Sequence, residues 1–490
     1  MSAPGLATAW TDLVATAMLG TDRRPLPTVA AGTVEAFGTG PDAAIALLDR
    51  AAAVVAARRA GAVPEPAGKP LPECPLDPRP PCPRRAARRL GAMLDGHHPD
   101  LLPEWLAALQ AAGWAAPSEH LARLMEVARA DPEARHAVQT LAGPLTAWLF
   151  DIVPGLGWEP PGDPVDAWER GGAADRVDAM RRLRATDPAA ARALMASGLA
   201  GDRAEVRAAC YAALAIGLGA DDEALLELAL DDRVASVRGV AARLLAALPG
   251  SAWAGRMARR VEQMVHVVGP AGRDRFDIRL VAPVPARWER DGIDAAAPPG
   301  TSLGAHVLGQ VIAGTPLSSW EGLGPTPHLV VLASEHELGP VLIAGWAAAT
   351  IRQRRADWAR LLVDETAEPG MVAVLDREDL EQLGRRLATA DGVLTALGLA
   401  TWEALGRPWP ASLGPQVAEA VVALLLERRV GRHHGPSLRR LARALDPPVL
   451  VPLAGALSGL DLPPPIDGLR DDLAERLRFR AAMLEELTPA

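Results

Sequence analysis

Apolar residues recur along much of the chain at the spacing of one helical face. In the stretch 203–216 they stand at i, i+3, i+4, i+7 and i+8: Val206, Ala209, Cys210, Ala213 and Leu214. The stretch 234–248 repeats this spacing with Val237, Val240, Ala241, Leu244 and Leu245. Because many of these side chains are small, neighbouring helices can approach closely. The pattern predicts packed amphipathic helices, and the fold class we expect is mainly all-α.

Breaks in this pattern divide the chain into four regions. Residues 1–161 are an N-terminal helical region that contains a proline-rich, extended connector at 63–83. Residues 166–261 hold helical repeats, and residues 262–299 are a β-like insert and loop. Residues 302–490 are a C-terminal helical region, in which no clear repeat period is visible.

Helices are expected in three of these regions. The N-terminal helices are predicted at 9–19, 42–60, 84–94, 102–112, 118–130 and 132–141. The middle helices are predicted at 175–184, 188–197, 203–216, 222–230, 234–248 and 252–261. The C-terminal helices are predicted at 303–313, 340–354, 356–363, 377–388, 394–400, 415–429, 437–444, 448–458 and 469–487. In the insert, the β-like runs 265–268 and 276–281 flank a Gly/Pro turn, which predicts a small β-hairpin.

Two segments of the middle region resemble each other at a period of 31 residues. The pair Val206-Arg207 matches Val237-Arg238, and an aspartate precedes each pair, with Asp202 and Asp232 one position out of register. A period of this length is typical of helical solenoids. The pattern resembles the HEAT-repeat family, in which the aspartate caps a helix and the arginine bonds to a neighbouring loop. The resemblance implies a HEAT-like α-solenoid, and it gives structural roles to Asp202, Arg207, Asp232 and Arg238.

Composition excludes a generally phosphate-binding surface. Nearly all of the 51 basic residues are arginine, because Lys69 is the single lysine. This bias is better explained by a GC-rich, bacterial genome than by a function that needs arginine. The net charge of −9 argues against binding nucleic acid over the whole molecule.

Cysteine use and hydropathy indicate a cytoplasmic protein. Cys74, Cys82 and Cys210 are an odd, sparse set, which fits a reducing compartment. The longest uncharged apolar run, near 338–351, is shorter than the roughly 18 residues that a membrane span needs. Residues 1–20 lack the basic n-region of a signal peptide, so we expect an amphipathic helix there.

Motifs that carry chemistry are mostly absent. The sequence has no Gly-x-x-x-x-Gly-Lys-Ser/Thr loop, no Gly-x-Ser-x-Gly elbow and no His-Glu-x-x-His. Cys74 and Cys82, with His97 and His98 downstream, lack the tight paired spacing of a zinc site, so we interpret them as loop residues. We therefore expect no catalytic residue, no cofactor and no metal.

A second polar group is also better explained by structure. His328 and the run Glu335-His336-Glu337 have the side chains for metal binding or acid–base work. The favoured interpretation is that this run opens a helix leading to Trp346.

The tryptophans have two interpretations. Trp105 and Trp114, or Trp402 and Trp409, would suit the lining of a concave groove. In a chain poor in Phe and Tyr, we favour core anchors.

The strongest candidate for a partner site is a basic segment near the C-terminal end of the sequence. It contains Arg428, Arg429, Arg432, His433, His434, Arg439, Arg440 and Arg443. No acidic residue follows Glu427 in this segment, so it has the charge to contact phosphates or an acidic protein face. The favoured alternative is a solvated helix–loop–helix surface in an arginine-rich protein.

Scattered motifs resemble an uncharacterised bacterial domain family with HEAT-like repeats. They are Trp10-Thr-Asp-Leu-Val, Leu19-Gly-Thr-Asp-Arg-Arg-Pro, Trp288-Glu-Arg-Asp-Gly-Ile, Leu308-Gly-Gln, Pro316-Leu-Ser-Ser-Trp320 and Gly345-Trp-Ala-Ala-Ala. Genes of that family often lie beside genes for a SWIM zinc-finger protein, a MoxR-type AAA ATPase and a von Willebrand A-type protein. The resemblance implies such protein partners and carries no catalytic residue across.

The leading functional hypothesis is a non-catalytic protein–protein interaction scaffold, because helical stacks present long concave surfaces. Its partner would be a protein, with the AAA ATPase or the von Willebrand A-type protein as candidates. The alternative is nucleic-acid binding or base excision of the HEAT-like DNA glycosylase type. The isoelectric point of about 5.7 disfavours that alternative. A third hypothesis is an unrecognised small-molecule enzyme in the C-terminal region.

Overall fold

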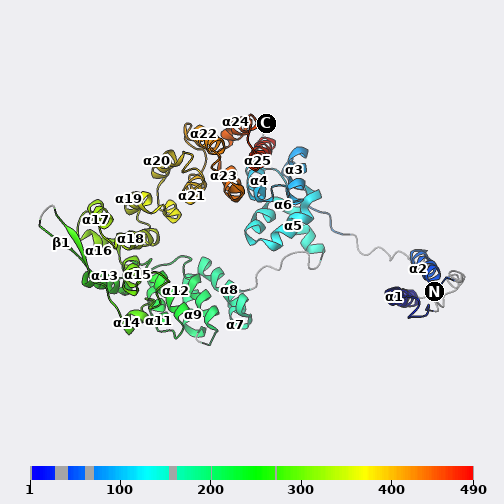
Figure 1. Ribbon diagram of the computed structural model, residues 1–490. Helices are drawn as coiled ribbons and strands as arrows, with labels where there is room; N and C mark the ends of the chain where they lie inside the picture. Colours follow the sequence, from blue (N-terminus) through cyan, green and yellow to red (C-terminus); the bar gives the residue numbers. More distant parts are fainter. Residues whose placement is uncertain are drawn as a thin grey trace. The chain divides into compact units, whose positions relative to one another are not determined.

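The computed structural model describes residues 3–27, 42–60, 71–153, 163–199, 201–270 and 273–488 (Figure 1). These residues are mainly helical, and the sheet among them is a small two-stranded hairpin. The predicted fold class, mainly all-α with a β-hairpin insert, is confirmed. None of the described helices combines the length and apolar character that a bilayer span requires.

The chain divides into two compact units, Met1–Pro75 and Leu76–Ala490. The first unit contains α1 (Ala3–Leu19) and α2 (Ala43–Ala60), both expected from the sequence. These two helices pack through three buried side chains: Leu13, Leu47 and Val54. Part of the predicted connector, at 63–70, lies outside the described residues.

The second unit begins with a group of helices that has its own core. They are α3 (Arg84–Leu94), α4 (Leu102–Ala111), α5 (Leu121–Ala130) and α6 (Pro132–Ile152). The predicted helix at 132–141 was too short, because α6 resumes after a kink at Gly143, where φ is +54°. Pro144 can follow this kink because a helix tolerates proline in its first turn. Arg79 donates to the carbonyls of Thr140 and Leu141 just before the kink.

The rest of the second unit is a succession of helices around one small sheet. The helices before the sheet are α7 (Pro164–Arg170), α8 (Ala173–Thr186), α9 (Pro188–Gly198), α10 (Ala204–Ala213), α11 (Glu223–Ala229), α12 (Ala235–Leu245) and α13 (Ala252–Met264). Those after it are α14 (Ala286–Arg290), α15 (Leu303–Gly314), α16 (Leu317–Glu321), α17 (Thr326–Ser334), α18 (Gly339–Gln353), α19 (Ala356–Thr366), α20 (Arg377–Leu387), α21 (Ala396–Ala404), α22 (Leu413–Leu426), α23 (Gly435–Ala444), α24 (Pro447–Ser458) and α25 (Ile466–Glu486).

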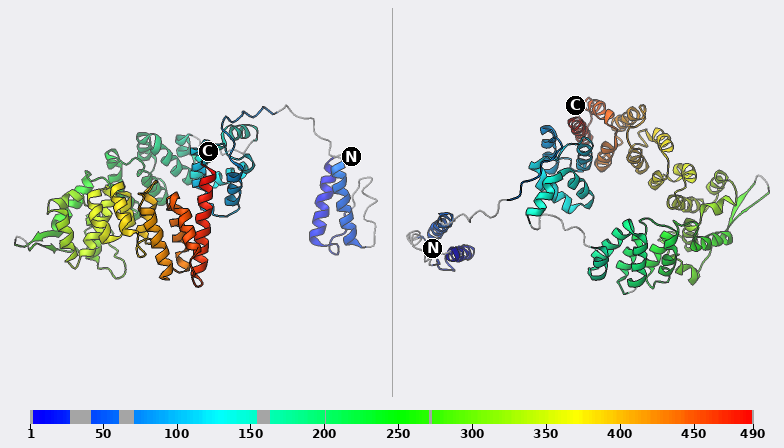
Figure 2. Two further views of the ribbon diagram at one scale, coloured as in Figure 1. Left: turned by 90° about the horizontal axis from the view of Figure 1, so that it is seen from above. Right: turned by 180° about the vertical axis from the view of Figure 1, so that it is seen from behind.

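Packing in this succession is between near neighbours in the sequence. Helix α8 packs on α10, α10 on α12, α15 on α18, and α21 on α23. The last two helices, α24 and α25, lie side by side and are orange and red in Figure 2. One continuous apolar core joins these helices, from Trp168 to Leu477.

The predicted hairpin is present between α13 and α14. Strand β1 (Val265–Val268) pairs antiparallel with β2 (Arg275–Ile278), so that Val265 faces Ile278. Phe276 is buried, and its ring centroid lies 6.2 Å from that of Trp346 in α18. The hairpin is therefore anchored to the helical core through its second strand.

Four short helices were not predicted: α7, α14, α16 and α17. Each has only one to three turns, and the prolines and glycines on either side interrupt the apolar pattern that would reveal it. The expectation that Glu335-His336-Glu337 opens a helix was wrong. These residues form the turn between α17 and α18, and the His336 Nδ1 accepts from the amide of Leu338. Helix α18 begins at Gly339, where a β-carbon would lie 1.9 Å from the carbonyl oxygen of Ala333.

Helix α25 joins the α3–α6 group to the rest of the second unit. Its apolar residues Phe479, Met483 and Leu487 belong to the core of α3–α6. The fully buried Arg480 donates to Glu104 in α4 at 2.7 and 2.8 Å, and also to carbonyls of the α23 end. Sequence patterns gave no sign of this packing between residues so far apart.

These contacts predict acid sensitivity. Burial raises the pKa of the Glu104 carboxyl, but its bonds to Arg480 and the charges of Arg480 and Arg407 lower it more, so the pKa lies below its ordinary value. A lowered folded-state pKa means that the stabilisation is present above the unfolded pKa of about 4.3 and is lost as pH falls below it. Urea unfolding at about pH 7 and about pH 3.5 should show the loss. In the Glu104→Gln variant the free energy of unfolding should fall less between these two pH values. An equal fall in the variant and the unchanged protein would contradict the role given to Glu104.

Candidate functional site

Arginines in three alternate helices, α8, α10 and α12, bond to aspartates in the turns between helices. Arg207 in α10 donates to the Asp232 carboxylate at 2.7 and 2.8 Å and to the Asp202 carbonyl at 2.6 Å. Arg238 in α12 donates to the Asp232 carbonyl at 2.9 Å. Arg176 in α8 stands one 31-residue period before Arg207 and donates to the Asp202 carboxylate at 2.7 Å. The sequence interpretation missed Arg176, although its period was the available signal.

The offset of one position between Asp202 and Asp232 does not interrupt these contacts. In both segments the backbone carbonyl of the aspartate accepts from the arginine that follows it, Arg207 for Asp202 and Arg238 for Asp232. The Asp232 carboxylate also accepts from the amide of Val234 at the start of α12. Its hydrogen bond from Arg207 is the main reason that the pKa of Asp232 lies below its ordinary value.

The basic segment at 428–443 is partly neutralised by carboxylates from earlier parts of the chain. Arg429 forms an ion pair with Asp391, and Arg440 pairs with Glu403 at 2.8 Å. Arg443 lies 3.5 Å from the same Glu403. The Nδ1 of His434 accepts from the amide of Gly431. Within the described ranges, three of its arginines have no ion pair: Arg428, Arg432 and Arg439. The segment is thus exposed but carries less unbalanced charge than its sequence indicates.

The tryptophans serve mainly as core anchors. Trp105, Trp402 and Trp409 are all buried, whereas Trp114 is half-buried. The indole NH of Trp402 donates to the carbonyl of Val393 at 2.9 Å. Trp409 also lies at the edge of an apolar groove between α22 and α24. The core interpretation is therefore confirmed for three of the four.

The polar residues considered for chemistry do not come together as the sequence suggested. His328 bonds to Asp274 across 3.1 Å, while Glu335 and Glu337 stay in the turn before α18. Burial, with the charges of nearby glutamates, raises the pKa of the Cys82 thiol to about 12. A thiol in that state is a poor nucleophile and a poor metal ligand at neutral pH.

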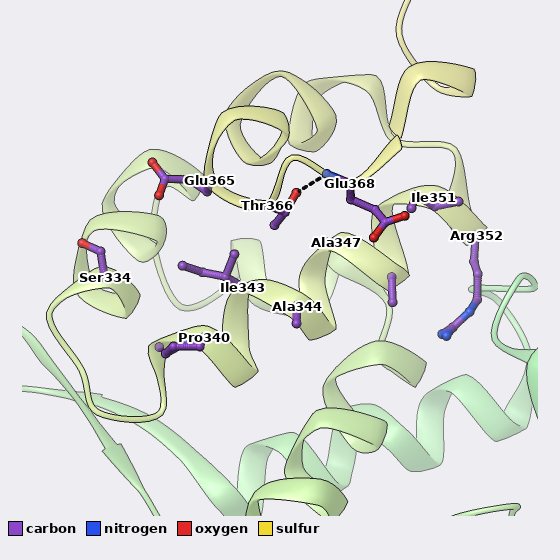
Figure 3. A pocket seen from close by; sticks show the side chains of 12 residues that line it. Ser334, Pro340, Ile343, Ala344, Ala347, Ile351, Arg352, Glu365, Thr366 and Glu368 are labelled. Atoms are coloured by element: carbon purple, nitrogen blue, oxygen red, sulfur yellow. Dashed lines mark hydrogen bonds between the residues drawn. The ribbon is translucent and has the colours of Figure 1, made fainter. Parts of the chain in front are cut away.

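A groove of about 630 Å³ lies between α12, α15 and α18. A second hollow of about 720 Å³ lies along α18 towards α19 and is seen in Figure 3. The two share Pro340, Ala344, Ala348 and Arg352 in their lining, so they meet along one face of α18. Together they form what we call the α18 groove.

Small residues explain why this groove is open. Its floor is lined by Gly239, Ala242, Ala305, Gly309, Ala313, Ala344 and Ala348. Helices α15 and α18 approach so closely that a β-carbon on Gly345 would lie 2.6 Å from the Ile312 side chain. Helix α13 approaches α15 equally closely, because a β-carbon on Gly314 would lie 2.6 Å from the Trp253 side chain. Short side chains between tightly packed helices leave a concave surface that an incoming backbone can approach.

One end of the α18 groove is positively charged. Arg352 is half-buried and donates to the carbonyl of Ala313 at 2.7 Å, and Arg243 is exposed. In the part of the chain that the structure covers, neither arginine has a carboxylate partner. Burial lowers the pKa of Arg352, and the charge of Arg243 lowers it further. Since the two cations repel each other, an incoming anion would be stabilised between them.

The groove has further polar groups at both ends. The Nε2 atom of His306 is buried in the lining without a hydrogen-bond partner. In the other hollow, Glu365 and Glu368 are exposed at the rim opposite α18 (Figure 3). Figure 3 shows Glu368 at the Ile351–Arg352 end of α18 and Glu365 on the side of Pro340, so both signs of charge line this hollow. No nucleophile–base pair is evident among its described lining residues.

The fold is mainly α-helical, with helices that pack chiefly on near neighbours in the chain and a groove along α18 that carries both arginines and glutamates. The chain belongs to a family of unknown function, DUF5691, which it matches over residues 12–487. Neither a curated protein nor a solved structure matches it.

Proposed function

We propose that this protein is a non-catalytic scaffold that binds an acidic segment of a partner protein in the α18 groove. The observation that carries the proposal is the pair Arg243 and Arg352, two cations without a described carboxylate partner in the lining of one groove. Many other arginines in the chain have such a partner, as Arg207 and Arg440 do. A carboxylate from another protein would complete the pair.

The shape of the groove favours an extended or helical protein segment. Its floor of glycine and alanine accepts a backbone at close range, whereas a small metabolite would be left with few polar contacts there. A segment with an acidic residue at Arg243 and a basic residue towards Glu365 would match the charges of the lining.

The wider proposal is that α7 to α13 are HEAT-like repeats, and that the stack acts in the cytoplasm with a MoxR-type AAA ATPase system. The 31-residue period with its Arg–Asp contacts supports the repeat assignment. The proposed regions 166–261 and 302–490 then both contribute to the groove, through α12 on one side and α18 on the other. The resemblance in the sequence motifs supports the choice of partner.

Blocking the groove is expected to abolish partner recovery. Ala344 is exposed in both hollows, so Ala344→Trp fills the groove without disturbing the core. Arg243→Glu reverses a charge at its positive end. Tagged protein purified from cells that naturally make it should yield a stoichiometric protein partner, and each variant should reduce recovery about tenfold or more.

The matched control is Arg439→Glu, which reverses an exposed arginine in the basic segment and should leave recovery unchanged. Samples with and without nuclease separate the protein hypothesis from the nucleic-acid alternative. Loss of the partner only in the Arg439→Glu variant, or only after nuclease treatment, would move the binding site to the basic segment and refute the groove.

A further inference from the structure

Two adjacent histidines and a distant glutamate converge between α3 and α25. The Nε2 of His97 lies 3.0 Å from Oε1 of Glu475, and the Nε2 of His98 bonds to the other carboxylate oxygen. The glutamate stands 378 positions after His97. One ligand atom from each residue lies within 4.8 Å of the other two. In the described parts of the chain this is the one cluster of three such groups, and it includes no cysteine.

The backbone brings the two imidazoles to the same side. His98 has φ +53°, in the left-handed region that non-glycine residues rarely occupy. In that conformation the rings of His97 and His98 lie 4.4 Å apart, and both contact the Phe479 ring at about 5 Å. Backbone conformations of this kind concentrate at functional sites.

The three side chains differ in their exposure to solvent. His98 is only 8% exposed, whereas His97 is 51% exposed and Glu475 is 47% exposed. One ligand is thus fixed by packing, and the other two remain open to solvent and to an entering ion. Two imidazoles and one carboxylate are a set that binds zinc with a water molecule in the fourth position.

We propose that His97, His98 and Glu475 bind a divalent transition-metal ion, with Zn²⁺ as the best match to these ligands. Each imidazole would coordinate through Nε2 in the tautomer protonated at Nδ1, and the carboxylate would coordinate through one oxygen or both. Bonds of about 2.0–2.1 Å require the ligand atoms to lie about 3.3 Å apart. The Nε2 of His97 and the Oε1 of Glu475 are 3.0 Å apart, and all three ligand atoms lie within 4.8 Å of one another. The ion would fasten the turn after α3 to α25.

The site can be tested with Zn²⁺ on the metal-depleted, full-length protein by calorimetry and thermal unfolding. We expect about one ion per chain and a higher Tm with zinc, since an ion that binds the folded state stabilises it. His97→Ala and Glu475→Gln should each weaken binding about tenfold or more. His98→Asn should do the same, and it keeps a residue that tolerates the left-handed backbone.

The matched control is His328→Ala, which removes a histidine from a similar histidine–carboxylate pair at 3.1 Å that has no second imidazole. That variant should bind zinc like the unchanged protein. Absence of zinc binding, or equal binding by the His97→Ala, His98→Asn and Glu475→Gln variants, would overturn the proposal. Partner recovery through the α18 groove is a separate readout, so the two proposals fail independently.

Discussion

Replacing Arg184 with alanine should lower the free energy of unfolding by about 3 kcal/mol, because it leaves the buried Asp222 carboxylate with one remaining cation, the partly exposed Arg192 at 3.2 Å. The side chains of Arg184 and Asp222 are both 0% exposed, and they are paired at 2.9 Å. The guanidinium also donates to the carbonyls of Leu214, Ile216 and Gly217 at the end of α10. Urea unfolding measured at neutral pH checks this value.

Two further variants test whether the loss of stability comes from the buried charge or from any arginine substitution in this region. Arg182→Ala removes a neighbouring arginine whose partner, Asp178, is mostly exposed, and it should cost less than about 1 kcal/mol. Arg184→Met combined with Asp222→Leu should recover part of the loss, since no uncompensated charge stays buried. A double variant as unstable as Arg184→Ala would show that the uncompensated charge is not the cause.

The Glu104→Ala variant should also lose about 3–5 kcal/mol, and the loss should centre on α3–α6 and α25. Without Glu104, the guanidinium of Arg480 is fully buried with only backbone carbonyls as partners. Hydrogen exchange of the α25 amides should therefore become faster. The exchange of α8 and α10, which pack mainly on each other and on α7, α9 and α12, should change little.

The control for this prediction is Glu485→Ala in α25, the helix that contains Arg480. Glu485 is exposed, so the substitution should change stability by less than about 0.5 kcal/mol. Equal hydrogen exchange in the two variants would mean that the Arg480–Glu104 pair does not fix α25 against α4.

Local signals in the sequence were enough to predict most helices. Apolar spacing, prolines at helix starts and the 31-residue period placed α3, α9 and α12 within a few residues. These signals did not predict elements whose formation depends on contacts between residues far apart in the sequence. The second half of α6 follows a kink whose carbonyls are bonded by Arg79, 61 and 62 positions earlier. Short helices such as α16 and α17 are stable because Leu317, Trp320 and Leu329 are buried in the common core.

The candidate sites were less predictable, since long-range pairing creates them. The basic segment looked unbalanced because Asp391 and Glu403, which pair with it, belong to earlier parts of the chain. The α18 groove is lined by glycine and alanine, which carry no chemical signal in a sequence. The expectation of no metal considered His97 and His98 beside cysteines, because nothing in the sequence links them to Glu475.

The most direct test of the proposed function is photo-crosslinking in cells that naturally make the protein. A photoreactive amino acid at position 344 would lie in the α18 groove, and one at position 439 would lie on the basic segment. We predict a crosslink to one abundant protein partner from position 344 and none from position 439. A crosslink only from position 439, or crosslinks to nucleic acid, would contradict the account.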